Sequence, residues 1–210
     1  MQSEDCRLCK SQAPFFNSEK REYFLCPFCK AIFVGRQYLP NQTKEKERYL
    51  EHNNNISDSG YQNFVTPVVK AISECFSSSA SGLDYGAGTG PVVAKMLSDS
   101  NYKIELFDPF FYNNPELLEN TYDFIICCEV AEHFHYPEKE FELLRKMLNP
   151  NGKLFCQTSI FHENIDFKKW YYKNDFTHVF FYQKETFEFI KKRFGFTDCT
   201  IKGNLIVLLN

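Results

Sequence analysis

Hydrophobic and polar residues follow a pattern along the chain that changes near residue 81. From there on, short apolar runs are separated by longer amphipathic stretches. Short apolar runs are typical of buried strands, and strands that alternate with helices are typical of an α/β sheet. The runs predict strands at 81–85, 103–107, 124–128, 154–159, 197–201 and 205–209.

Amphipathic spacing predicts the helices that accompany these strands. The clearest is the helix 137–148, which starts with a proline, a residue favoured in a first helical turn. Another helix begins near Thr186. Before the first strand, the charged segment 43–50 predicts a helix with Thr43 as its cap, and the apolar positions of 61–76 predict a second one that packs on the core.

Four of the nine cysteines form two C-x-x-C pairs separated by sixteen residues. They are Cys6, Cys9, Cys26 and Cys29. This spacing is typical of a four-thiolate zinc site, in which two tight turns direct their sulfurs at one ion. Two redox dithiols or four buried thiols are the alternatives, but a redox pair normally opens a helix after a buried strand. The sequence therefore predicts a structural zinc ribbon at the start of the chain.

Composition and charge narrow the classes of function. The chain has 210 residues, of which 43% are hydrophobic and 24% charged, as expected for a folded globular protein. The net charge of −3 provides no basic field for nucleic-acid or anionic-membrane binding. The apolar runs are much shorter than the ~18 to 20 residues of a membrane helix. Since the acidic first residues also lack the apolar stretch of a secretion signal, we expect a cytoplasmic protein without a membrane partner.

A glycine-rich loop follows the strand 81–85. It has an acidic residue, Asp84, before glycines at alternate positions, and the residues expected to contact a ligand are Asp84, Gly86, Ala87, Gly88 and Gly90. Glycine permits positive φ and lets the backbone approach a ligand closely. A dinucleotide fingerprint would need glycine at position 91, where the chain has proline, and the lysine of a P-loop is absent. The loop therefore predicts a different nucleotide-like ligand.

This D-x-G-x-G-x-G loop resembles the first motif of class I S-adenosylmethionine-dependent methyltransferases. Three further segments strengthen the resemblance: a strand that ends in Asp108, the E-x-x-E-H motif of 129–133, and the turn 148–154, in which Asn151 replaces a glycine. The resemblance implies that S-adenosylmethionine is the cofactor, that Asp108 accepts hydrogen bonds from both ribose hydroxyls, and that Glu129 contributes to the cofactor site.

The resemblance extends to a little-characterised bacterial group of small methyltransferases with an N-terminal zinc ribbon. The zinc knuckles, the linker 48–54 and the segment 170–178 carry it. The group implies a zinc ribbon at 1–40 and a Rossmann-like methyltransferase domain at 43–210 that includes the helices within 43–76. Only fourteen positions separate Asp108 from Tyr122, too few for the family's third strand with its helices. We therefore expect a six-stranded sheet with a shortened third-strand region.

The candidate catalytic residues are His133, His178 and Asp175. His133 follows the strand 124–128, and a general base is useful when the methyl acceptor carries a hydroxyl. Asp175 and His178 are three residues apart and could pair as carboxylate and imidazole. We expect the two histidines to converge beside the methyl donor, with Tyr171 or Tyr172 between them. The structural alternatives are a hydrogen bond from His133 to a neighbouring loop and a loop cap at Asp175.

The function predicted from these residues is methyl transfer from S-adenosylmethionine to a small-molecule acceptor. The acidic net charge and the aromatic segment 170–172 favour this acceptor class over a polyanion. Two alternatives stay open: an RNA or protein methyltransferase that docks its substrate through the ribbon, and a cofactor-binding scaffold without catalysis.

Overall fold

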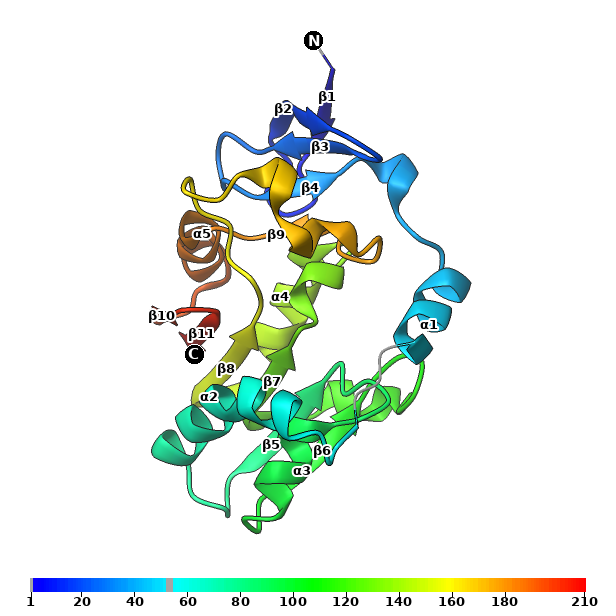
Figure 1. Cartoon of the computed structure of the whole chain (residues 1–210). Coiled ribbons are helices and arrows are strands. Elements are labelled where there is room, and N and C mark those ends of the chain that lie inside the picture. The colour runs from blue at the N-terminus through cyan, green and yellow to red at the C-terminus, as the bar shows by residue number, and fades with distance from the viewer. Residues whose placement is uncertain (1, 52–54) are drawn as a thin grey trace.

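The computed structural model describes residues 2–51 and 55–210 (Figure 1). Residues 52–54, the end of the linker that contributes to the resemblance, lie outside the described residues. None of the described helices has both the length and the apolar character that crossing a membrane requires.

A six-stranded mixed sheet forms the larger part of the molecule, which confirms the predicted Rossmann-like α/β fold. Its strands, in spatial order, are β10 (Asp198–Lys202), β11 (Leu205–Leu209), β8 (Leu148–Gln157), β7 (Tyr122–Cys128), β5 (Ser81–Tyr85) and β6 (Lys103–Phe107). The pairs among β5, β6, β7 and β8 are parallel, and β11 is antiparallel to both of its neighbours. The sheet ends at β6, and the short 3-10 helix Pro115–Glu119 occupies the region of the missing third strand.

The two faces of this sheet are covered by different helices. α2 (Ser59–Cys75) and α3 (Val92–Ser98) pack on one face, and α4 (Pro137–Lys146) and α5 (Lys184–Phe194) pack on the other. β7 shows the cause, because successive side chains of a strand point to opposite faces. Phe124 and Ile126 belong to the core under α2 and α3, whereas Ile125 and Cys127 belong to the core under α4 and α5.

Several predicted element ends differ from the structure, and the largest difference is in β8, which runs from Leu148 to Gln157 rather than over 154–159. The helix predicted at 137–148 ends at Lys146, because the carbonyl of Met147 already accepts the Tyr122 amide at the start of the sheet. The first helix, α1 (Gln42–Glu51), contains Thr43 rather than being capped by it. The side chain of Asn41 accepts from the Lys44 amide at 3.0 Å and takes the capping role.

The N-terminal ribbon consists of four short strands and a fifth from the far end of the chain. These are β1 (Ser3–Asp5), β2 (Gln12–Ser18), β3 (Glu22–Leu25), β4 (Ile32–Val34) and β9 (Phe180–Phe181), which pairs with β4. The buried guanidinium of Arg7 joins the same elements, because it donates to the carbonyls of Val34 at 2.7 Å and Val179 at 2.8 Å. The ribbon is thus integrated with the connection 160–183, while the boundary at residues 40–43 stays a prediction.

Candidate functional site

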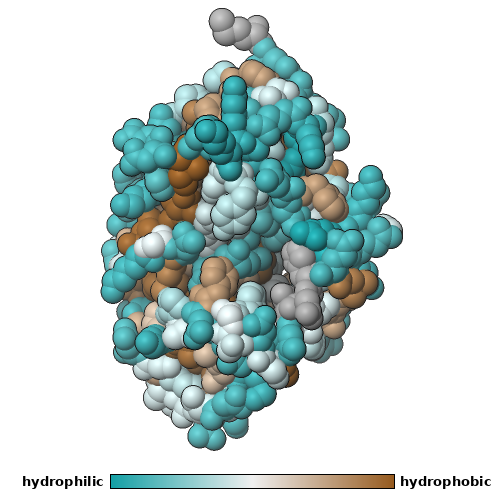
Figure 2. All heavy atoms as spheres, viewed as in Figure 1, coloured by the Kyte–Doolittle hydropathy of each residue, from teal (hydrophilic) through white to brown (hydrophobic). Residues whose placement is uncertain are grey.

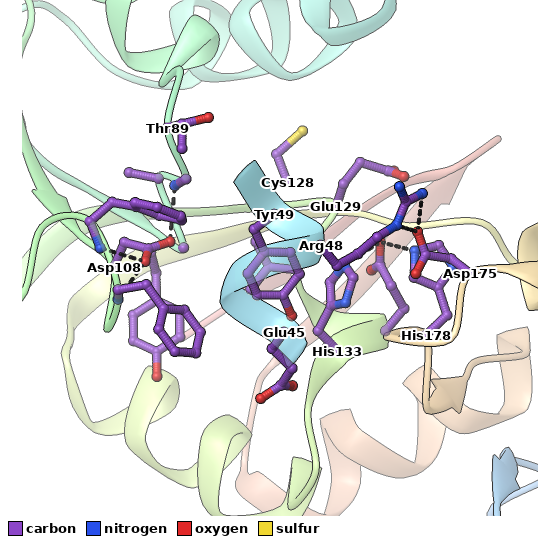
Figure 3. A pocket seen from close by; sticks show the side chains of 18 of the residues that line it. Glu45, Arg48, Tyr49, Thr89, Asp108, Cys128, Glu129, His133, Asp175 and His178 are labelled. Atoms are coloured by element: carbon purple, nitrogen blue, oxygen red, sulfur yellow. Dashed lines mark hydrogen bonds and ion pairs between the residues drawn. The ribbon is translucent and has the colours of Figure 1, made fainter. Parts of the chain in front are cut away.

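A cavity of about 1170 Å³ opens at the carboxyl ends of the parallel strands. The loops after β5, β6 and β7 line it, together with α1 and the connection after β8. The surface of this face is hollowed between the ribbon end and the α2–α3 end of the molecule (Figure 2). Ligands of open α/β sheets usually bind at this edge. Figure 3 shows Thr89 and Asp108 at one end of the cavity, the two histidines toward the other, and Tyr49 of α1 between them.

The glycine loop has the backbone that its sequence predicts. Gly86 and Gly88 have φ values of 85° and 59°, and a Cβ on Gly86 would lie 2.6 Å from a methyl carbon of Val130. Glycine is therefore required at position 86 for both reasons. The amides of Gly86 and Ala87 donate to the Phe107 carbonyl at 2.8 and 3.1 Å. These two amides hold the loop against β6, so backbone donors for a ligand must come from later in the loop.

Asp108 lies in the cavity wall with its carboxylate largely committed to backbone amides. Oδ1 accepts from Phe110 at 2.8 Å and from Phe111 at 3.1 Å, and Oδ2 accepts from Gly88 at 3.0 Å. A carboxylate oxygen accepts about two hydrogen bonds. The expected contact of both oxygens with a ribose is therefore not possible in this arrangement, and Oδ2 alone keeps an acceptor position.

Three acidic groups of the cavity, Asp84, Glu129 and Glu140, have raised pKa values, and burial is the largest cause for each. Burial, and then the neighbouring Asp108, raise the pKa of Asp84 to about 7. Burial, and then Glu132, raise the pKa of Glu129 to about 9, although a hydrogen bond from Tyr172 opposes the shift. Glu129 also has a φ of 53°, unusual for a non-glycine residue, and its amide donates to Gln157 at 2.8 Å. Strained backbone of this kind is often found at functional sites.

The two histidines converge, as the sequence predicts. The ring centroids of His133 and His178 are 4.8 Å apart with the rings nearly perpendicular, and the ring of Tyr172 lies 4.3 Å from that of His178. Burial, and then His133, lower the pKa of His178 to about 4, so this imidazole is neutral at pH 7. The Nδ1 atom of His133 lies 3.0 Å from the Thr177 carbonyl, which is the structural contact considered as its alternative role.

The carboxylate of Asp175 is held by Thr177 and Arg48, whereas the prediction pairs it with the imidazole of His178. Its Oδ1 accepts from the amide and hydroxyl of Thr177 at 3.0 and 2.7 Å, and its Oδ2 accepts from the guanidinium of Arg48 at 2.8 Å. The ring nitrogens of His178 instead lie at the Tyr172 carbonyl, 2.7 Å away, and near Glu132. Asp175 therefore caps its loop and fastens α1 across the cavity.

The predicted site residues do not include α1, and Glu132 has no predicted role beyond its place in the E-x-x-E-H motif. Glu132 is fully buried, and its carboxylate accepts from the hydroxyls of Tyr172 at 2.6 Å and Thr158 at 2.9 Å. The E-x-x-E-H motif contains Glu132, so a signal for it exists in the sequence. The ring of Tyr49 in α1 lies 5.2 Å from that of His133. No local pattern separates the cavity-facing side of this short charged helix from its solvent-facing side.

The four ribbon cysteines lie together with free thiols. Cys6 and Cys29 have their sulfurs 3.6 Å apart, those of Cys9 and Cys26 are 3.4 Å apart, and all four sulfurs lie within 4.8 Å of one another. A tetrahedral zinc ion with bonds of about 2.3 Å would place its sulfurs about 3.8 Å apart. The donor set and its spacing therefore fit such an ion.

The family follows from a comparison with protein-family models. The model of the methyltransferase domain matches residues 58–201, which is more than half of the chain. The chain belongs to this methyltransferase family. The matched range begins just before α2 and ends in β10, so it contains the whole sheet except β11. A search of curated protein sequences found no match.

Solved structures of methyltransferases share the fold of this methyltransferase domain. An O-methyltransferase family protein from Burkholderia thailandensis is 11% identical with a TM-score of 0.54, and the match covers 83% of this chain and 64% of that one. The calicheamicin-biosynthesis methyltransferase CalO1 in its SAH-bound form is 12% identical with a TM-score of 0.54, and the match covers 80% of this chain and 57% of that one. Human N-acetylserotonin methyltransferase in complex with SAM is 13% identical with a TM-score of 0.53, and the match covers 71% of this chain and 53% of that one. The chain thus spans less than two thirds of each of these proteins.

The raised pKa of Glu129 predicts a pH dependence of stability for the methyltransferase domain. A carboxyl whose pKa rises from 4.5 to about 9 on folding keeps its proton in the folded state, so stability falls as the pH rises between these values. We expect Glu129→Gln to remove this loss, so that the variant melts at a higher temperature than the wild type at pH 8 and at a similar one at pH 4.5. Thermal melts without cofactor test this, with the exposed Glu163→Gln as control. If the melting temperatures of the wild type and Glu129→Gln change with pH in the same way, the raised pKa of Glu129 is contradicted.

Proposed function

We propose that the protein transfers the methyl group of S-adenosylmethionine to an oxygen of a small-molecule acceptor. The observation that carries the proposal is that the glycine loop with Asp108 and the pair of His133 and His178 open into the same cavity. An O-methyl acceptor is supported by the similar fold of the O-methyltransferase family protein from Burkholderia thailandensis. Residues of α1 and the segment around Tyr172 line the cavity and partly enclose it. Such a cavity suits a small molecule better than a polymer.

In this proposal the cofactor binds along the carboxyl ends of β5, β6 and β7. The residues that would hold it are Asp84, Gly86, Ala87, Gly88, Gly90, Asp108 and Glu129. The loop supplies close backbone approach, and the free acceptor position of Asp108 takes one ribose hydroxyl. The Glu129 carboxyl would lose its proton when the positively charged amino group of the cofactor binds beside it, since an opposite charge lowers the pKa of a carboxyl group.

The chemical step needs the acceptor oxygen placed in line with the bond to be broken. Bound S-adenosylmethionine would supply a methyl carbon on a positive sulfur; the acceptor oxygen would form the new C–O bond as the electron pair of the C–S bond returns to sulfur. The chain's own contribution is to hold the acceptor beside His133 and His178, exclude water, and assist the loss of the hydroxyl proton. Asp175 acts as a positioning residue, because it fastens Arg48 of α1 over the cavity.

Two measurements test this function. Calorimetry is expected to give one S-adenosylmethionine site per chain with a dissociation constant in the micromolar range. Transfer of a tritiated methyl group is then measured against a set of hydroxylated small molecules, total RNA and unfolded protein. Transfer to RNA or protein alone would overturn the small-molecule acceptor, and absence of cofactor binding would overturn the methyltransferase activity itself.

We further propose that Cys6, Cys9, Cys26 and Cys29 bind one structural zinc ion. The nine cysteines are all free thiols, as expected for the reducing cytoplasm in which we place the protein. Elemental analysis of purified protein is expected to give one zinc per chain, and Cys9→Ser is expected to reduce this content and lower the melting temperature. Cys75→Ser, at an exposed cysteine outside the ribbon, is the control. Less than half an equivalent of zinc in the wild type would count against the site.

A further inference from the structure

We infer that Glu132, His133 and His178 form a binding site for one divalent transition-metal ion, separate from the ribbon cysteines. We infer also that the ion faces the acceptor oxygen, a role that rests on the proposed function. The site combines one carboxylate with two imidazoles, and all three side chains line the same cavity.

The three donor atoms converge on one point. Glu132 Oε1 lies 3.9 Å from Nε2 of His133 and 4.0 Å from Nε2 of His178, and the three ligand atoms all lie within 4.8 Å of one another. Ligands around an ion with bonds of about 2.1 Å stand roughly 3.0 to 3.4 Å apart. Small side-chain rotations would therefore bring these atoms to coordinating distance.

The other ring nitrogens hold both imidazoles in the form that binds metals. Nδ1 of His133 lies 3.0 Å from the Thr177 carbonyl, and Nδ1 of His178 lies 2.7 Å from the Tyr172 carbonyl. A carbonyl oxygen can only accept, so each Nδ1 carries the proton and donates. In a neutral imidazole this leaves a lone pair on Nε2, and such backbone contacts typically orient metal-ligating histidines.

The geometry of the buried Glu132 side chain leaves a place for a cation between the three groups. Both Nε2 atoms face the fully buried Oε1 of Glu132 at 3.9 and 4.0 Å, distances that are too long for a hydrogen bond. Among the ion pairs of the described residues, Glu132 takes part only in those with the two histidines. Tyr172 and Thr158 stabilise the carboxylate through its other acceptor positions. A metal ion bound by the three groups would bring a positive charge next to this buried side chain, where a carboxylate is stabilised by a cation.

The ligand types indicate which ions fit. Imidazole nitrogens suit iron, nickel, copper and zinc, whereas magnesium and calcium prefer oxygen ligands. Two histidines with one carboxylate are typical of open ferrous sites. Three protein ligands leave further positions for oxygens from the cavity. An acceptor hydroxyl bound there would lose its proton to water more readily than a free one. In this role His133 and His178 are ligands, and neither has to act as the base.

Binding of Mn²⁺ to protein that carries one zinc per chain, the content expected for the ribbon alone, tests the site, because manganese is paramagnetic and thiolates bind it weakly. Electron paramagnetic resonance is expected to show one Mn²⁺ per chain. His178→Gln and His133→Gln are expected to weaken binding at least tenfold, whereas His162→Gln, at an exposed histidine, matches the wild type. Glutamine keeps a polar side chain of similar length, and melting curves verify that each variant folds. If one histidine variant does not fold, the other is sufficient for the test.

The outcomes separate this site from the proposed function. Absence of binding by the folded wild type of both Mn²⁺ and, without oxygen, Fe²⁺, or equal Mn²⁺ binding by both histidine variants, would overturn the metal site. Binding of Mn²⁺ with methyl transfer that a chelator leaves unchanged would overturn the role at the acceptor. Calorimetry with S-adenosylmethionine in the absence of Mn²⁺ tests the cofactor site independently, so its failure would contradict the proposed function and not the metal site.

Discussion

Replacement of His133 by alanine is expected to lower kcat by about a hundredfold or more while the affinity for S-adenosylmethionine stays nearly unchanged. The ring of His133 lies beside His178 and Tyr49, at the end of the cavity away from Asp108 (Figure 3). Its removal takes away a group next to the proposed acceptor oxygen and leaves the proposed cofactor contacts in place. The same result is expected for His178→Ala.

Steady-state kinetics together with calorimetry measure the two effects separately. His162→Ala serves as the control, since His162 is exposed and far along the connection from the cluster. A kcat within threefold of wild type for both His133→Ala and His178→Ala would show that the cluster has no part in the chemical step. A large loss of cofactor affinity instead would place these histidines at the cofactor.

Asp108→Ala is expected to weaken S-adenosylmethionine binding roughly ten- to a hundredfold, equivalent to about 1.5 to 3 kcal/mol. The variant loses the acceptor for a ribose hydroxyl, and it also releases the three amides that shape the cofactor wall. Asp108→Asn keeps one side-chain oxygen and is expected to fall between Asp108→Ala and the wild type.

Calorimetry measures these affinities, and thermal melts verify that the variants remain folded. Asp99→Ala is the matched control, because Asp99 lies at the exposed end of α3, where it pairs with Lys95. If Asp108→Ala binds the cofactor as tightly as the wild type, the ribose lies elsewhere in the cavity.

The local patterns of the sequence predict most of the sheet. Strands β5 and β6 have the bounds 81–85 and 103–107 that their apolar runs indicate. The glycine loop and the C-x-x-C pairs are equally local, because a backbone with positive φ or a tight turn depends on a few adjacent residues. The number of strands also follows from the sequence, since the short segment between Asp108 and Tyr122 cannot hold another strand with its helices.

By itself, then, the sequence determined the order of strands and helices, the glycine loop, the cysteine pairs and the candidate histidines, because each depends on residues close together in the chain. Only the tertiary structure decided which distant segments meet. Arg48 pairs with Asp175 across 127 positions, and Arg7 donates to Val179 across 172. It also decided that Glu132, rather than Asp175, is the carboxylate between the two histidines. Such contacts depend on how α1, the ribbon and the connection 160–183 pack on the sheet, and side-chain periodicity along one segment carries no information about its partner.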